Sequence, residues 1–244
     1  MKAKTLLIAV AALAAGVISS QAQVYSQNIV GYANVNTPNG GTYLISVPFK
    51  IGVSNGANEV WPLVGGNPSL PDYSSILVWD GASYTTYVSD STSPTLWDDA
   101  GFAPLTAAPV LPVGKGFFLV PSASVTNTFA GVISVSVNSS NLMSLPNGGT
   151  YLIASPVPYA GSITNGDSTT GVGGVGLSSL NGLPDYSSIL VWNGASYDTY
   201  VSDSTSPSLW DDAGFAPLAA PPTIAVGQSI FIVPSADFTW KVGL

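Results

Sequence analysis

The sequence LPDYSSILVWDGASYTTYVSDSTSPTLWDDAGFAPL at residues 70–105 returns almost unchanged at residues 183–218. Only three of the 36 aligned positions differ, and these are Asp80/Asn193, Thr85/Asp198 and Thr95/Ser208. One offset of 113 residues carries the first copy onto the second, which is typical of an internal duplication. We therefore expect an architecture in which one unit is built twice.

The repeated stretch predicts a β-hairpin. An apolar run at residues 74–79 is followed by Asp80-Gly81, and residues 83–88 then return as a second strand. The other copy has Asn193-Gly194 at the turn, which is the other dipeptide favoured in tight hairpins because both members tolerate the left-handed region.

Further strands are expected on both sides of the hairpin, at residues 24–36, 42–49, 114–120, 125–137 and 238–242. Residues 50–69 and 100–113, rich in Gly, Asn, Ala and Pro, are expected to be irregular. We predict an all-β chain of two tandem modules, residues 23–131 and 132–244, each a β-sandwich or a partly closed barrel. The alternative is one pseudo-symmetric barrel made from both halves.

The N-terminus has the pattern of a signal peptide. Lys2 and Lys4 precede an apolar segment at residues 6–18, and Ser20-Gln21-Ala22 offers a small-residue cleavage site. We expect residues 1–22 to be removed and the protein to be secreted. The apolar segment is too short to span a membrane, and no later segment has 18 uninterrupted apolar residues.

Charge excludes nucleic acid as a partner. The mature chain keeps Lys50, Lys115 and Lys241 against 13 acidic residues, and it contains no arginine. A phosphate backbone requires clustered basic side chains. Charged residues make up 7% of the chain, where about 25% is typical, so Ser, Thr, Asn and Gly must cover the surface. Such a surface is common where protein packs on protein.

Three motifs occur in both copies in the same order: Tyr-Leu-Ile-x-x-Pro, then Val-Trp-Asp/Asn-Gly-x-x-Tyr, then Val-Gly-Lys/Gln-x-x-Phe. This order resembles a repeat of uncharacterised secreted bacterial β-repeat surface proteins. The expected mature start, VYSQNIVGY at residues 24–32, also resembles the opening of exported bacterial β-proteins. The resemblance implies export and β-structure, and it carries over no catalytic residue.

Residue types leave little room for catalysis. The chain has no His and no Cys, which excludes Ser-His-Asp and Cys-His mechanisms and the usual zinc ligands. Carboxylate chemistry is left, with Asp98-Asp99 and Asp211-Asp212 as the best acidic pairs. Neighbouring residues on a strand point to opposite faces, so neither pair forms an acid–base couple across a glycosidic bond. We expect no catalytic residue and no enzyme.

Two kinds of binding site are weighed. Aromatic side chains beside the polar loops could stack on sugar rings, and the candidates are Tyr87, Trp97, Tyr200 and Trp210. Hard oxygen ligands in the same loops could hold calcium, and the candidates are Asp90, Asp98, Asp99, Asp203, Asp211 and Asp212. Aromatic core packing and Asx-turns explain the same residues without a ligand.

The leading hypothesis is a non-enzymatic secreted structural or interaction protein. A glycan- or calcium-binding adhesive module is the alternative, and a carboxylate-dependent hydrolase comes third. Self-assembly is a further hypothesis: a strand at residues 125–136 would serve both modules, and residues 24–30 would add to the exposed edge of a neighbouring molecule. Pairing of residues 25–30 within their own module is the competing arrangement.

Overall fold

The computed structural model of the chain describes residues 30–49, 57–59, 70–133, 140–166 and 174–243. Within these residues the regular structure consists of β-strands and one short 3-10 turn, η1 (Ser179–Asn181). The prediction of an all-β chain is therefore confirmed. The expected signal peptide at residues 1–22 and the segment 24–29 lie outside the described residues.

Described residues 30–133 are called the N-terminal half. Its strands, in chain order, are β1 (Val30–Thr37), β2 (Tyr43–Ser46), β3 (Ala57–Glu59), β4 (Ser75–Trp79), β5 (Tyr84–Ser89), β6 (Trp97–Asp99), β7 (Val110–Pro112), β8 (Gly116–Val120) and β9 (Val125–Val132).

Described residues 140–243 are called the C-terminal half. Its strands are β10 (Ser140–Leu145), β11 (Tyr151–Ala154), β12 (Gly161–Ser162), β13 (Ser188–Trp192), β14 (Tyr197–Ser202), β15 (Trp210–Asp212), β16 (Thr223–Ile224), β17 (Ser229–Val233) and β18 (Phe238–Gly243).

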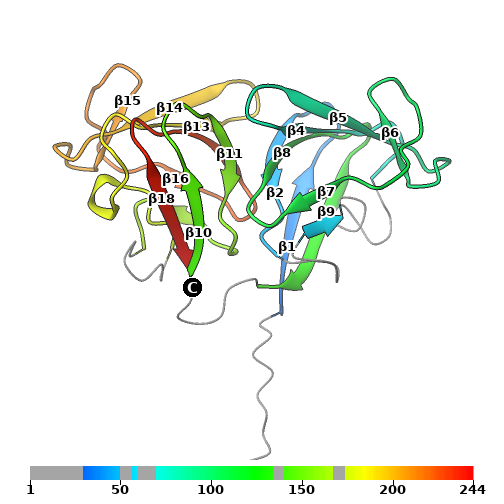
Figure 1. Ribbon diagram of the computed structural model, residues 1–244, viewed down its shortest axis with the longest axis horizontal. Coiled ribbons are helices and arrows are strands. Elements are labelled where there is room, and N and C mark those ends of the chain that lie inside the picture. Colours follow the sequence, from blue (N-terminus) through cyan, green and yellow to red (C-terminus); the bar gives the residue numbers. More distant parts are fainter. Residues whose placement is uncertain (1–29, 50–56, 60–69, 134–139, 167–173, 244) are drawn as a thin grey trace, which may run out of the picture.

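Each half contains one five-stranded antiparallel sheet with the same strand order. The order is β2-β8-β4-β5-β6 in the N-terminal half and β11-β17-β13-β14-β15 in the C-terminal half. Figure 1 shows the halves side by side, with β2 and β11 near the middle of the molecule and β6 and β15 at its two outer ends.

Smaller two-stranded sheets accompany each large sheet, and the first and last strands of each half pair with each other. Strand β1 pairs with β9, placing Gly31 opposite Gly131, and β10 pairs with β18. A single strand shared by both halves was expected at residues 125–136. That expectation is wrong, because β9 ends at Val132 and the next strand, β10, pairs with the end of the chain instead.

Two segments expected to be irregular contain strands. Strand β3 lies in the 50–69 segment and β7 lies in the 100–113 segment, and the two pair antiparallel with Ala57 opposite Pro112. Proline is tolerated here because Pro112 is the last residue of its strand, where a missing backbone N–H disturbs little of the ladder.

The predicted hairpin is present in both halves, but its turn is not the two-residue type. Trp79 lies opposite Tyr84, so residues 80–83 form a four-residue connection. Gly81 has φ +114°, whereas Asp80 is not in the left-handed region. Asp80 acts through its side chain, because Oδ1 accepts from the backbone N–H groups of Ala82 and Ser83 at 2.8 and 2.7 Å. Asn193 does the same with Ala195 and Ser196.

Period-two alternation sends neighbouring side chains to different layers. In β8, Phe117 and Leu119 are fully buried in the core of the N-terminal half, where Phe129 of β9 also packs. Phe118, between them, points the other way and joins a separate cluster with Leu152 of the C-terminal half.

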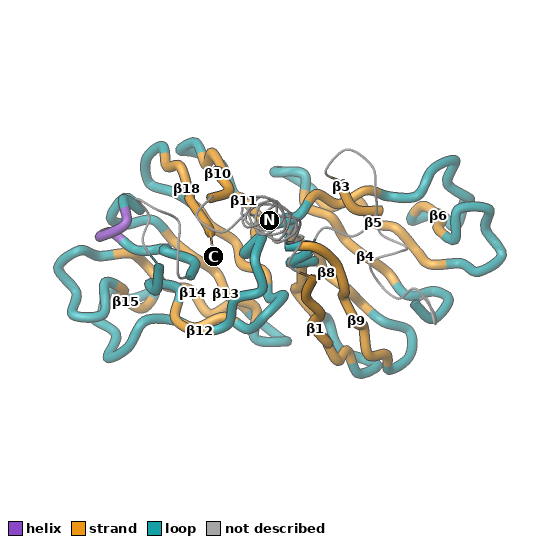
Figure 2. The backbone as a smooth tube through the Cα atoms, turned by 90° about the horizontal axis from the view of Figure 1, so that it is seen from below, coloured by secondary structure: helices purple, strands orange, loops and turns teal. Residues whose placement is uncertain are grey.

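The C-terminal half repeats this arrangement. Ile230 and Ile232 of β17 lie in its own core with Trp240, and Phe231 joins the cluster between the halves. The five-stranded sheets therefore have one face on their own core and one face toward the other half. Figure 2 shows β1–β9 and β10–β18 at diagonally opposite positions around the centre of the molecule, as a two-fold relation between the halves requires.

Candidate functional site

The predicted glycan-binding tryptophans are core residues. Trp97 is 1% exposed and Trp210 is fully buried, so neither offers a ring face to a sugar, and the hypothesis that they stack on glycans is wrong. Both follow a loop but begin an edge strand whose first side chain points inward. Tyr87 and Tyr200 are half-buried and pack against the two cores.

The predicted calcium ligands serve the loops instead. Asp90 accepts hydrogen bonds from Thr92, the buried Asp98 accepts one from Ser93 Oγ, and Asp99 Oδ1 accepts from the N–H groups of Gly101 and Ala103. The second copy has the same contacts: Asp203 accepts from Thr205, Asp211 accepts from Ser206 Oγ, and Asp212 Oδ1 accepts from the N–H groups of Gly214 and Ala216.

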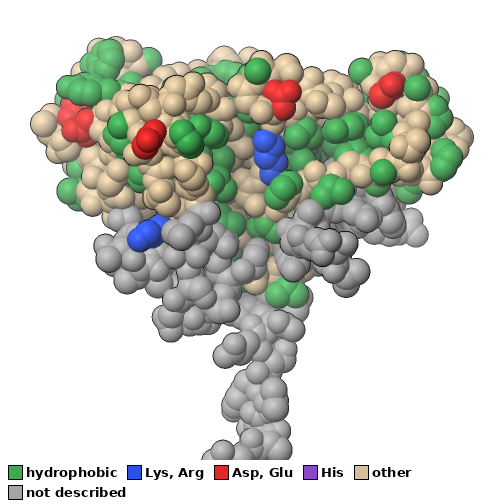
Figure 3. Space-filling view, in the orientation of Figure 1, with side chains coloured by type: hydrophobic (Ala, Val, Ile, Leu, Met, Phe, Trp, Pro, Cys, Tyr) green, Lys and Arg blue, Asp and Glu red, His purple; other side chains and the backbone are tan. Residues whose placement is uncertain are grey.

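These contacts account for the acidic residues without a metal. The hydrogen bonds from Thr92 hold the pKa of Asp90 below its usual value, and those from Thr205 do so for Asp203. In the described part of the chain, no three Asp, Glu, His or Cys side chains come together in a way that could hold a metal ion. On the face drawn in Figure 3, the acidic side chains stand at separate places. The arrangement does not support the calcium hypothesis.

Six aromatic rings form a closed circuit where the halves meet. Successive ring centroids are 4.9 to 5.8 Å apart, mostly in edge-to-face orientation, which is the favoured geometry for aromatic pairs. In order around the circuit the members are Trp79, Phe231, Tyr197, Trp192, Phe118 and Tyr84.

Hydrogen bonds between the halves are reciprocal. Trp79 Nε1 donates to the carbonyl oxygen of Thr150 at 2.9 Å, and Trp192 Nε1 donates to that of Thr42 at 2.7 Å. Two backbone hydrogen bonds between the halves form a second reciprocal pair: Ala154 N–H donates to the carbonyl oxygen of Gly114, and Ser46 N–H donates to that of Gly227. Each bond therefore has a counterpart at the matching position of the other half, as in an isologous contact.

Two tyrosines of the circuit are affected electrostatically by this packing. Burial raises the pKa of Tyr84, and burial together with the nearby Tyr84 raises the pKa of Tyr197. Both hydroxyls therefore lose their protons at a higher pH than an ordinary tyrosine does.

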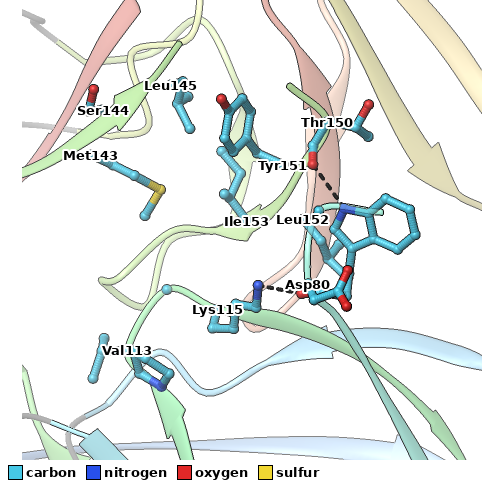
Figure 4. Close-up of a pocket in the computed structure, with 14 residues that line it drawn as sticks. Asp80, Val113, Lys115, Met143, Ser144, Leu145, Thr150, Tyr151, Leu152 and Ile153 are labelled. Atoms are coloured by element: carbon cyan, nitrogen blue, oxygen red, sulfur yellow. Dashed lines mark hydrogen bonds between the residues drawn. The ribbon is translucent and has the colours of Figure 1, made fainter. Parts of the chain in front are cut away.

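Two related pockets flank the contact. One, of about 280 Å³, is lined by Trp79, Asp80 and Lys115 together with apolar residues of β10 and β11. Figure 4 shows Lys115 reaching toward the β4 end, where Nζ donates to the carbonyl oxygen of Trp79 at 2.5 Å. Burial lowers the pKa of Lys115, and the charge of Asp80 opposes that change.

The matching pocket, of about 310 Å³, contains Trp192, Asn193 and Gln228 at the equivalent positions. It is therefore neutral where the first pocket has an acidic and a basic group. The Lys115 ammonium group holds the turn before β8 to the end of β4 through its bond to the carbonyl oxygen of Trp79.

A different pair of sites lies at the outer ends. Tyr73 and Phe102 are 66% and 60% exposed, and their rings meet edge to face with centroids 6.3 Å apart. Tyr186 and Phe215 repeat the pair at 6.5 Å, with 68% and 61% exposure. We call the first pair, with its two turns at residues 71–74 and 99–103, head 1, and the second pair, with residues 184–187 and 212–216, head 2. Phe102 and Phe215 follow β6 and β15, the strands at the two ends in Figure 1.

Sequence reasoning missed the heads because nothing in the local pattern separates these aromatics from core aromatics. Tyr73 and Phe102 sit in LPDYS and DDAGF, where each follows turn-forming residues. The only usable signal was this position directly after Asp or Gly, outside any alternating run.

No protein-family model matches the chain, and neither the curated proteins nor the solved structures include a significant match to it. Among the described residues, no helix has the length and apolar character needed to cross a membrane.

Proposed function

We propose that the protein is a secreted, non-enzymatic interaction protein that presents two equivalent binding heads on one rigid body. The observation that carries this proposal is the exposed aromatic pair at each outer end, held in the same conformation in both halves. Exposed aromatic groups of this size are common at interaction sites, because water solvates them poorly and a partner can cover them.

The contact between the halves supports the rigid body. Reciprocal indole hydrogen bonds, reciprocal backbone bonds and the six-ring circuit join the two five-stranded sheets. Burying an aromatic pair is worth about 0.5–1.5 kcal/mol beyond the area it covers. Several such pairs together favour one fixed arrangement of the heads over a flexible tether.

Duplication and export complete the proposal. The 36-residue repeat, the equal sheet orders and the separate hydrophobic cores favour two copies of one ancestral module. The basic, apolar and small-residue regions at residues 1–22 favour cleavage before Gln23 and release from the cell. Mass spectrometry of the exported protein should then find Gln23 at the N-terminus.

The test compares binding to the surface and extracellular matrix of the exporting cells. The mature protein should sediment with that fraction, whereas the double variant Phe102→Gly/Phe215→Gly should not. Tyr32→Ser is the control, because Tyr32 is 75% exposed but belongs to neither head. Equal sedimentation of all three proteins overturns the proposal. Substrate turnover that is lost in Asp98→Asn/Asp211→Asn would favour the carboxylate hydrolase instead.

Self-assembly by strand exchange is the second candidate function, and one observation favours it. Among the described strands, each strand of the sheets β1–β9 and β10–β18 has a strand partner along one edge only. The edges of the large sheets are covered, since β6 is bridged by Pro104 and β2 by Gln228. Light scattering of the mature protein with and without residues 23–30 tests it. Monomers in both samples at high concentration would exclude assembly.

A further inference from the structure

The backbone at the heads is strained for the residues that occupy it. Tyr73, Phe102, Tyr186 and Phe215 have φ between +61° and +67°, a region that glycine enters freely and bulky L-residues avoid. Glycine is common in this chain, with 26 residues, yet all four positions carry large aromatics. Each of these residues is more than half exposed, and its ring packs on the other ring of its pair.

Hydrogen bonds fix the turn that carries Tyr73. Its N–H donates to the carbonyl oxygen of Ser89 at 2.7 Å, and Ser74 N–H donates to Pro71 at 3.1 Å. Asp72 ties this turn to the next loop, since its two carboxylate oxygens accept from the N–H and the hydroxyl of Ser91. The tyrosine ring is therefore presented on a rigid support.

The turn that carries Phe102 is fixed in the same way. Phe102 N–H donates to the carbonyl oxygen of Asp99 at 3.0 Å, and Asp99 Oδ1 accepts from Gly101 and Ala103. In head 2 the same contacts hold Tyr186 and Phe215. Prior ordering of this kind lowers the entropy cost of binding.

The polar surroundings decide which class of ligand fits. Each head combines two aromatic rings with carboxylate oxygens and serine hydroxyls, and its turns contain no cationic group. The two described lysines lie elsewhere, Lys115 at the pocket between the halves and Lys241 in β18. An anionic ligand would meet like charge, and so would the head of a second copy.

A neutral, hydroxyl-rich ligand suits this chemistry. Its hydroxyl groups can donate to carboxylate oxygens such as those of Asp72 and Asp99, while the C–H faces of a sugar ring pack on the exposed rings. Asp72 and Asp99 already accept hydrogen bonds within the turns, and each carboxylate keeps a further lone pair with which it can accept from a ligand hydroxyl.

We propose that each head is a binding site for neutral carbohydrate, with Tyr73 and Phe102 as the stacking residues of head 1 and Tyr186 and Phe215 as those of head 2. This inference rests on the function proposed above and names its ligand class. It moves the glycan site away from Trp97 and Trp210, which are buried. Because the heads are at opposite ends of one body, a polysaccharide can be held at two points at once.

The experiment uses the mature protein and three kinds of probe. The first is neutral carbohydrate of the dextran, mannan and β-glucan types, as soluble oligosaccharides and as immobilised polysaccharides. Alginate serves as an anionic polysaccharide, and polylysine serves as a basic polypeptide. Calorimetry with the matching neutral oligosaccharide should give two sites per chain. Phe102→Gly should leave one site with unchanged affinity, and Phe102→Gly/Phe215→Gly should leave none.

In Phe102→Gly, retention on the immobilised polysaccharide should fall by much more than the halving of the number of sites. Losing one of two linked sites removes avidity, which typically contributes roughly 10²–10⁴-fold. The glycine variants also separate binding from folding. Glycine relieves the strain at φ +61°, so the melting temperature of both variants should stay level or rise. Tyr32→Ser should bind as the parent does.

Each outcome decides the matter. Binding to neutral sugar that disappears in the double variant, with an undiminished melting temperature, supports the proposal. No neutral probe bound, or equal binding by parent and double variant, overturns it, as does binding to polylysine or alginate alone. If the double variant still loses sedimentation with the matrix fraction while no neutral sugar binds, the proposed interaction function stands and only the ligand class is wrong.

Discussion

Gly116 and Ser229 face each other across the contact between the halves. A Cβ atom on Gly116 would lie 2.8 Å from both Cβ and Oγ of Ser229, and equally close to Cγ of Leu152. The two residues occupy the same position of the repeat, at the start of β8 and of β17. The contact therefore has room for one small side chain at this point and not for two.

Gly116→Val should weaken the contact between the halves. Overpacking a close contact typically costs about 1–3 kcal/mol, and here the neighbours are a buried serine and a leucine rather than flexible chain ends. Urea unfolding of the mature protein measures the change. Ser229→Ala is the matched control and should be neutral or stabilising, because Ser229 Oγ is buried and has no hydrogen-bond partner among the described residues. A fully stable Gly116→Val would contradict the close approach.

Gly81→Val should destabilise the protein by about 1–2 kcal/mol through backbone strain alone. The residue has φ +114°, and an added Cβ would meet no atom within 4 Å. Gly81→Ala should then cost nearly as much as Gly81→Val, because the strain belongs to the backbone and not to side-chain size. Thermal melting of both, with Ala82→Val at the neighbouring exposed position as control, checks this. An unchanged melting temperature for Gly81→Val would contradict the positive φ of Gly81 in this turn.

Asp80→Asn should reduce the sensitivity of the fold to acid. Hydrogen bonds from Ser83 and Ala82 hold the pKa of Asp80 below 3.8, its ordinary value. The stability that this group contributes is present above that pH and is lost as the pH falls through its lowered pKa. Asparagine accepts the same backbone bonds without titrating, as Asn193 already does.

Urea midpoints of Asp80→Asn and the parent, compared near neutrality and at about pH 2.5, test this. The two proteins should be alike near neutrality, and the variant should lose less on acidification. The parallel change Asn193→Asp should increase the loss. Identical pH profiles for all three proteins would show that the hydrogen bonds to Asp80 do not stabilise its charged form.

Tyr84→Phe/Tyr197→Phe should extend stability into alkaline solution. Burial raises the pKa of both tyrosines above 10.0, the ordinary value. The unfolded chain therefore loses these protons first, so stability is fully present below about pH 10 and declines as the pH rises from there. Phenylalanine removes this linkage. Chemical unfolding from about pH 8 to pH 11 should show a smaller alkaline decline in the double variant. An equal decline would show that the fold does not raise the pKa of these tyrosines.

The sequence predicted the strand framework well where local patterns determine it. The repeated apolar run and its Gly turn placed β4, β5 and their counterparts correctly, because a period of two is a local property. The predicted turn type was wrong. Asp80 and Asn193 do not have positive φ, and they stabilise the turn because their side-chain oxygens accept backbone hydrogen bonds. The residue type alone does not distinguish this role from a left-handed backbone.

The residues proposed for binding were less predictable, because the exposure of a side chain depends on distant parts of the chain. Trp97 follows a polar loop but is covered by the core of its own half, whereas Tyr73 lies just before the central strand β4 and is exposed. No local pattern states that Trp79 donates to Thr150, 71 residues away. The contact between the halves therefore became visible only in three dimensions.

Covalent linkage of the halves makes the contact that contains the reciprocal bonds of Trp79 and Trp192 independent of protein concentration. Two free subunits joined by such a contact separate when they are diluted, because their association depends on concentration. Here one chain supplies both partners, so each half meets the other at a local concentration that the surroundings cannot lower. For the secreted protein proposed above, that arrangement keeps the two heads together at any dilution.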